Sequence, residues 1–522
     1  MNLLASAQFA APQIPWASLV PIIIVFGGAV LGVLVEAFAP AKNRRSLVIG
    51  VTLLTPLAAG AVLATRWLPV LDSPSSFGEY IEDPLSVAAQ FILVLIAFLA
   101  ILVMADRSEI GDGAFASQPS DRPGSSDEEL SDRKNYQRSE MFPLTLFSLG
   151  GMMLFSAADS YVLLFVALEV MSLPLYILAA TARRRRQLSQ EAGLKYFILG
   201  AFASAFLLMG SAFLYGFSGS LTISTLANRV ALDSSMDWLV LIGVFSVMLG
   251  LLFKVGAAPF HAWTPDVYTG APTPVTGFMA AAVKVAAFSA MLRFYEVVAA
   301  ILQWDLVPVL MGVAFLTMLI GTFTGIVQSD VKRMLAFSSI AHAGFILLGV
   351  FSLVKLSTGH VLFYVIAYGI ATVGAFGVVS LVRSTNEEGV VGPEATALQR
   401  WAGLGKKNPL MAGAMLVFLL SFAGIPLSAG FVGKFLVFSD AFAGGFGWLV
   451  GFALACSAVT AFYYFRLVRL MFFTEAGPGA RVVKSEGLAY LTVLAAAAAT
   501  ILLGVFPGPV LSILSQVVIL LP

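Results

Sequence analysis

Fourteen apolar stretches follow one another along almost the whole chain. Each runs for roughly 20 residues, which is enough to cross a lipid bilayer as a helix. In lipid, every backbone N–H and C=O group needs a partner inside the protein, and a helix supplies these partners within one segment. We therefore predict an all-α polytopic membrane protein. Its spans are centred near Gly28, Leu57, Val94, Gly150, Glu169, Phe206, Gly250, Lys284, Met318, Ile346, Ile370, Ile425, Val459 and Ala496.

The composition agrees with this class and excludes several functions. Only 11% of the residues are charged, against about 25% in soluble domains. The net charge of +1, with no basic face, gives no sign of nucleic-acid binding. No dinucleotide or ATP-binding glycine motif is present, and Cys456 is the only cysteine, so this chain alone cannot form a four-cysteine iron–sulfur cluster. The three histidines lack metal-ligand spacing, so we expect neither a metal nor a redox cofactor here.

Loop charge predicts the orientation. If both termini face outward, 22 of the 30 Lys and Arg residues lie in cytoplasmic loops, four lie in outer loops and four lie within spans. The opposite orientation would place those 22 positive charges outside, so we predict that both termini face outward.

The start of the chain lacks a basic region followed by a cleavage site, so its first stretch is predicted to be a retained span. Residues 105–141 are rich in Ser, Asp, Glu, Gly and Pro and are predicted to form a flexible cytoplasmic loop, the alternative being a partner-binding tail.

Two of the stretches, about 238–267 and 409–441, are nearer 30 residues long. Each contains a segment rich in glycine and proline, KVGAAP in the first and AGIPLSAG in the second. Such segments favour two half-helices joined by unwound backbone, which at membrane depth lines protein or a water-filled cavity. We therefore predict broken seventh and twelfth helices.

A weak internal repeat relates spans that lie five apart. Charged or histidine side chains recur at offsets of 173, 165 and 180 residues, in the pairs Glu169 and His342, Lys195 and His360, and Lys254 and Lys434. An odd number of spans between two units inverts the second unit relative to the first. The predicted division is 1–104 (three N-terminal helices), 105–141 (loop), 142–300 (first repeat, spans 4–8), 301–475 (second, inverted repeat) and 476–522 (C-terminal helix).

Charged groups within the spans are the candidate functional residues. An ammonium or carboxylate at membrane depth is costly and marks a functional site by default. Lys254 and Lys284 lie too deep for their amines to reach the interface easily. The same argument applies to Lys434, for which Asp440, six residues later, is the nearest acidic residue in the sequence. Glu169 is central in its span, and a structural ion pair is the alternative to a functional role. A lysine whose acidic partner can approach or withdraw is a switchable proton site.

Other polar residues permit two interpretations. Lys195 either relays protons or extends to the cytoplasmic interface. His342 can pass protons between its two ring nitrogens, or can simply pack helices together. Arg293 and Glu296 are predicted to form a surface pair, and Lys332 is interpreted as a topology determinant.

Five segments resemble one known family. LEVMSLPLYIL around Glu169, EAGLKYFILG around Lys195, FKVGAAPFHAWTPDVYTGAPTPVTGF from Phe253, DVKRMLAFSSIAHAGF from Asp330 and SFAGIPLSAGFVGKF from Ser421 are similar to the antiporter-like subunits of proton-pumping NADH:quinone oxidoreductase, respiratory complex I. Within this family, the segment WTPDVYTGAPTPV and the lysine at position 434 are most similar to the branch called subunit N, the bacterial counterpart of mitochondrial subunit 2. The resemblance is specific from about residue 142 to 434.

The resemblance implies a proton-translocating membrane subunit of a bacterial inner membrane. It implies two inverted five-helix units and an outward proton relay through Glu169, Lys195, Lys254, Lys284, His342 and Lys434, in which Glu169 pairs with Lys254. It also implies that NADH, FMN, iron–sulfur clusters and quinone belong to partner subunits, and that neighbouring antiporter-like subunits and the lipid bilayer are the contacts of this chain. Two alternatives remain: a subunit of a multisubunit cation/proton antiporter, and a scaffold that conducts nothing.

Overall fold

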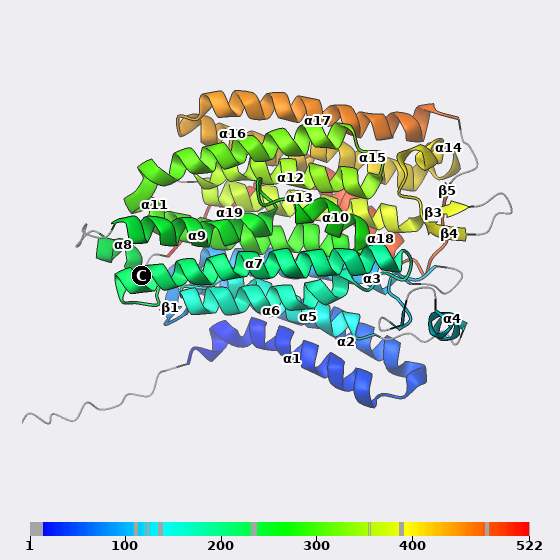
Figure 1. Cartoon of the computed structure of the whole chain (residues 1–522), viewed down its shortest axis with the longest axis horizontal. Coiled ribbons are helices and arrows are strands. Elements are labelled where there is room, and N and C mark those ends of the chain that lie inside the picture. Colours follow the sequence, from blue (N-terminus) through cyan, green and yellow to red (C-terminus); the bar gives the residue numbers. More distant parts are fainter. Residues whose placement is uncertain are drawn as a thin grey trace, which may run out of the picture.

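Long helices lie side by side with their axes roughly parallel, as the computed structural model shows (Figure 1). The structure describes residues 14–108, 113–118, 121–122, 125–133, 139–230, 237–352, 354, 356–385, 391–475 and 480–520. Within this part of the chain, 12 helical segments are long and apolar enough to cross a membrane, and α5 and α15 are shorter apolar helices.

The first half of the chain contains helices α1 (Trp16–Phe38), α2 (Ala41–Asp72), α3 (Pro84–Ala105), α4 (Ser126–Arg133), α5 (Met141–Ser156), α6 (Tyr161–Ala179), α7 (Arg186–Ser218), α8 (Thr225–Val230), α9 (Asp237–Val255) and α10 (Trp263–Gly270). The second half contains α11 (Thr273–Ile326), α12 (Val331–Val350), α13 (Ser357–Leu381), the 3₁₀ turn η1 (Leu398–Trp401), α14 (Leu404–Lys407), α15 (Pro409–Ala423), α16 (Ala429–Ala443), α17 (Gly447–Phe473), α18 (Leu488–Val505) and α19 (Gly508–Leu514).

Short strands mark the two ends of the bundle. β1 (Ser75–Phe77) and β2 (Tyr80–Glu82) form an antiparallel hairpin at one end, here named the hairpin end. β3 (Val382–Thr385), β4 (Val391–Glu394) and β5 (Ala480–Val482) form a sheet of order β4-β3-β5 at the opposite end, here named the sheet end. Figure 1 shows α4 and α14 at the sheet end and the C-terminus near the hairpin end.

The predicted spans are confirmed. Leu302 has non-helical backbone angles and divides α11 into two apolar segments, which account for the eighth and ninth spans. α9 with α10, and α15 with α16, form the seventh and twelfth. An even number of spans places both termini on the same side of the membrane.

Both predicted helix breaks are present. α9 ends at Val255 and is followed by Gly256 at φ 74°, and α15 ends at Ala423 and is followed by Gly424 at φ 79°. Glycine suits this left-handed conformation because it has no Cβ, and it often ends a helix in this way. In each pair the second half-helix continues toward the same end of the bundle as the first.

The described parts of segment 105–141 contact the body of the protein at the sheet end. Glu128 of α4 lies 3.4 Å from Arg186, the first residue of α7, and Phe115 forms a backbone bridge with Ala182. Residues 109–112, 119–120, 123–124 and 134–138 lie outside the described residues. The flexibility of this loop therefore stays a prediction.

The predicted surface pair of Arg293 with Glu296 is wrong. Arg293 is buried and forms two hydrogen bonds, of 2.9 and 2.8 Å, with the carboxylate of Asp83, whereas Glu296 is exposed. Asp83 also caps the N-terminus of α3. The prediction failed because the true partner lies 210 residues away in sequence and reaches Arg293 only through the packing of α3 against α11.

Candidate functional site

Lys254 occupies the last turn of α9 and is buried. Its Nζ donates to the Ser172 Oγ of α6 at 2.7 Å, and the rings of Tyr176 and Tyr196 each lie 5.5 Å from the nitrogen. Aromatic faces attract an ammonium, and the attraction is stronger away from water. The lysine is therefore held by a hydroxyl and two rings.

Glu169 lies one helical turn before Ser172 on α6. Ser172 bonds Lys254, but among the described residues no ion pair within 4.0 Å joins Glu169 to Lys254. The Glu169 Oε1 atom is buried and has no hydrogen-bonding partner among the described residues. The carboxylate therefore lies on the same helix as the Lys254 contact without being bonded to the lysine.

Lys284 of α11 connects Lys254 to the second half of the protein. Its Nζ donates to the carbonyl of Val255, the residue after Lys254, at 3.0 Å and to the carbonyl of Ser339 on α12 at 2.7 Å. Val255 ends α9, and the carbonyls at a helix C-terminus carry a partial negative charge. The break in the seventh span therefore supplies an acceptor for this buried ammonium.

His342 follows Ser339 on α12 by three residues and lies between two lysines. Lys284 bonds the carbonyl of Ser339, and Lys434 bonds the carbonyl of Phe422. The Nδ1 of His342 bonds the hydroxyl of Tyr364 at 2.8 Å, while its Nε2 is buried with no hydrogen-bonding partner among the described residues. Its ring centroid lies 5.6 Å from that of Phe422, which belongs to the last turn of α15.

Lys434 of α16 repeats the arrangement of Lys284 at the second break. Its Nζ donates to the carbonyls of Phe422 and Ala423 at 2.8 and 3.2 Å, and to the Ser457 Oγ of α17 at 2.8 Å. Phe422 and Ala423 end α15. Lys434 also lies in a largely apolar groove of about 490 Å³ between α16 and α17, whose other walls include Phe435.

These contacts place a series of buried polar groups from α6 to α17, here named the buried line. It begins at Glu169 and continues through Lys254, Lys284, His342 and Lys434. Along it, three buried polar atoms have no hydrogen-bonding partner in the part of the chain that the structure describes: Glu169 Oε1, Tyr196 Oη and His342 Nε2. Buried polar groups of this kind are commonly satisfied by ordered water. The line can therefore hold water between groups that titrate.

Lys195 lies apart from this line. Its side chain is 42% exposed and bonds Asp266 at 2.8 Å and Glu191 at 2.6 Å. Asp266 also accepts from Arg333 of α12 at 2.7 Å. Lys195 is therefore part of an ionic cluster near the sheet end, where α7, α10 and α12 meet.

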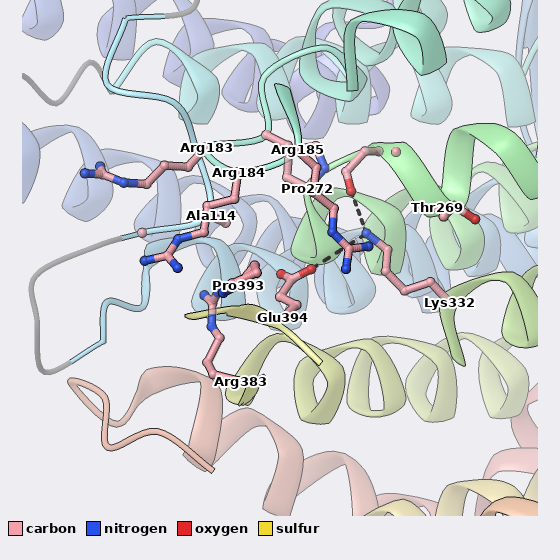
Figure 2. A pocket seen from close by; sticks show the side chains of 14 residues that line it. Ala114, Arg183, Arg184, Arg185, Thr269, Pro272, Lys332, Arg383, Pro393 and Glu394 are labelled. Carbon is pink, nitrogen blue, oxygen red and sulfur yellow. Dashed lines mark hydrogen bonds and ion pairs between the residues drawn. The ribbon is translucent and has the colours of Figure 1, made fainter. Parts of the chain in front are cut away.

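The sequence interpretation missed a buried amine near the sheet end. Lys332 is 2% exposed, and its Nζ donates to the carbonyl of Ala271 at 2.8 Å and lies 3.9 Å from Glu394. Figure 2 shows these groups lining a small cavity with Arg185 and Arg383 beside them. Its burial depends on the packing of α10 against α12, so the sequence around Lys332 gave no signal for it.

Within the described residues, no group of three or more His, Cys, Asp or Glu side chains could hold a metal ion. The acidic and basic groups of the buried line are too dispersed for coordination.

Comparisons with known proteins define the relationship of this chain. Residues 158–460 match the family described as "NADH:quinone oxidoreductase/Mrp antiporter, TM". The chain is 51% identical to NADH-quinone oxidoreductase subunit N of Beutenbergia cavernae, covering 98% of this chain and 99% of the relative. It is 46% identical to the subunit N of Mycobacteroides abscessus, covering 97% of both chains.

Two solved structures have a similar fold. A chain of respiratory complex I from Thermus thermophilus with bound aureothin superposes with a TM-score of 0.76 at 33% identity, covering 95% of this chain and all of that one. A chain of the Mrp complex from Dietzia sp. has a TM-score of 0.78 but only 20% identity over 96% of this chain and 97% of that one, which shows a shared fold alone. The chain belongs to the NADH:quinone oxidoreductase/Mrp antiporter family, as an antiporter-like, proton-translocating membrane subunit of the subunit N type in bacterial complex I.

Proposed function

We propose that protons cross this subunit through the buried line from Glu169 to Lys434, by way of Lys254, Lys284 and His342. Each lysine gains a proton on the side of Glu169 and loses it toward Lys434 as neighbouring charges change. Quinone reduction in other subunits of the complex supplies the energy. Lys195 serves the cytoplasmic entrance through its ionic cluster with Asp266.

One observation carries this proposal. Among the described residues, Lys254, Lys284 and Lys434 have only neutral hydrogen-bonding partners, which are carbonyls and hydroxyls. An ammonium buried without a paired carboxylate keeps its proton at a cost of several kcal/mol. Such a group releases its proton when a nearby positive charge approaches, and takes one when a negative charge does.

A contrasting pair in the same protein supports this distinction. Arg293 and Asp83 form a buried, bidentate ion pair, which is the geometry of a structural contact. A scaffold that used its lysines only for packing would pair them in the same way.

The direction of transport depends on the orientation. We propose that both termini face outward, so that the sheet end, with most of the basic loop residues, faces the cytoplasm. The five-part division at 104, 141, 300 and 475, with two inverted repeats, belongs to the same proposal. The paired breaks at Val255 and Ala423, each capped by a lysine, support such a repeat.

The test is NADH-driven proton uptake by inverted membrane vesicles containing the assembled complex. Lys284→Met should lower the protons taken up per NADH oxidised, because methionine has similar volume but cannot titrate. Lys406→Met, at an exposed lysine, is the control and should pump like wild type. Full uptake in an assembled Lys284→Met complex would reject the relay.

A further inference from the structure

A partly buried acid–histidine pair lies at the hairpin end of the second half of the protein. His360 is in the first turn of α13, and its Nδ1 lies 2.7 Å from the Asp440 Oδ2 of α16. Their side chains are 19% and 8% exposed. α13 runs from this pair to β3 at the sheet end, so the pair is at the opposite end of the helix from the predicted cytoplasmic loops.

The pair is connected to the buried line through Tyr364. This residue follows His360 by one turn on the same face of α13, and its hydroxyl bonds His342 Nδ1 at 2.8 Å. The backbone and ring of Tyr364 pack closely against Gly433, the residue before Lys434. Asp440 follows Gly433 by seven residues and so lies on the same face of α16. The faces of α13 and α16 that meet at Tyr364 therefore also meet at the His360–Asp440 pair.

We propose that His360 and Asp440 form the outward proton-release site of this subunit, with the Tyr364 hydroxyl as its link to His342. This inference rests on the proposed relay and adds its exit. The backbones of Tyr364 and His360 lie about 6 Å apart along α13, and we assign the link between their side chains to a hydrogen-bonded water.

The transfer conserves protons at each group. His342 takes up a proton from Lys434, where the relay ends, and gives one to the Tyr364 oxygen while the hydroxyl releases its own proton toward His360. His360 donates from Nδ1 to the Asp440 carboxylate, so its Nε2 is the nitrogen free to accept. The resulting imidazolium is stabilised by the carboxylate until Nε2 loses the proton to outside water. Tyr364 and the His360–Asp440 pair then return to their starting forms.

The experiment compares Asp440→Asn, Asp440→Glu and Tyr364→Phe in inverted vesicles containing the whole complex. Asparagine keeps a hydrogen bond to His360 but cannot stabilise an imidazolium, and phenylalanine keeps the ring but not the hydroxyl. Asp440→Asn and Tyr364→Phe should lose as much proton uptake per NADH as Lys434→Met, and Asp440→Glu should retain most of it. Glu82→Gln is the matched control, since Glu82 also forms a buried ion pair near the hairpin end, with Arg66, and should pump normally.

The outcomes separate the exit from the relay. Full uptake in both Asp440→Asn and Tyr364→Phe, with uptake lost in Lys434→Met, would overturn the exit and leave the relay standing. Full uptake in Lys434→Met as well would overturn both. If Asp440→Asn fails to assemble, the proton uptake of Tyr364→Phe alone tests the exit. This substitution removes only the hydroxyl oxygen from a buried site and preserves the packing.

Discussion

The Lys284 amine donates to the carbonyl of Val255, the residue that ends α9, at 3.0 Å. Lys434 does the same at Ala423, which ends α15, at 3.2 Å. Each break in a membrane-spanning helix thus provides carbonyls that hold an ammonium without a carboxylate. Because a neutral amine can also remain in such a site, the breaks favour lysines that exchange protons over lysines that only pack.

Glu169→Gln should reduce proton uptake while the complex still assembles. Among the described residues the carboxylate forms no ion pair with Lys254, which instead bonds Ser172 one turn along α6, so glutamine removes a charge and no bond. The measurement is NADH-driven proton uptake in inverted vesicles, with assembly verified by native electrophoresis. Wild-type uptake in the assembled variant would show that Glu169 has no part in the relay.

Asp83→Asn should instead weaken the protein itself. Removing one partner of the buried pair with Arg293 leaves an uncompensated charge, which costs about 3–5 kcal/mol. The variant should lower the thermal stability of the complex or the yield of assembled complex. Asp305→Asn, at an exposed carboxylate, is the control. An unchanged melting temperature in Asp83→Asn would contradict a structural role for the pair.

A cysteine at position 125 should report the orientation. After Cys456 is replaced, Ser125→Cys near α4 should react with a membrane-impermeant thiol reagent only from the cytoplasmic side. Ser73→Cys, just after α2 at the hairpin end, should react only from the outside. The reverse pattern would overturn the proposed topology and the direction of transport with it.

Gly430→Ala should disturb the second break. A Cβ at this position would collide with the carbonyl of Ser421, where the two half-helices approach each other. Overpacking of this kind costs about 1–3 kcal/mol and should displace Lys434, so that proton uptake falls. Gly451→Ala on α17 is the matched control, because a Cβ there meets nothing within 4 Å. Equal uptake by the two variants would argue against a precise geometry at the break.

The spans and their breaks were predictable from the sequence because both depend on local patterns. A 20-residue apolar run satisfies its own backbone as a helix, and the glycines at 256 and 424 mark where helices end. The partners of the buried charges were not predictable in this way. Lys254 bonds Ser172, although Glu169 was the obvious partner, and Arg293 bonds Asp83, although Glu296 is three residues away. These partners are set by how the helices pack against one another, and a local sequence pattern does not contain that information.

The same limit applies to the amines and histidines at the ends of the bundle. Lys332 follows a capping aspartate at the start of α12, the usual place for a topology residue. Its burial arises because α10 and α12 pack together. His360 and Asp440 are 80 residues apart and meet only because α13 packs against α16.

The most direct test of the relay is the pair of substitutions at Lys434. Lys434→Met removes the charge, whereas Lys434→Arg keeps it in a guanidinium that does not release its proton at working pH. Proton uptake per NADH oxidised is measured in inverted vesicles, on complexes shown to assemble. If Lys434 exchanges protons, both variants lose uptake to a similar extent. Robust uptake by Lys434→Arg together with loss in Lys434→Met would contradict proton exchange at this position and assign it a fixed charge.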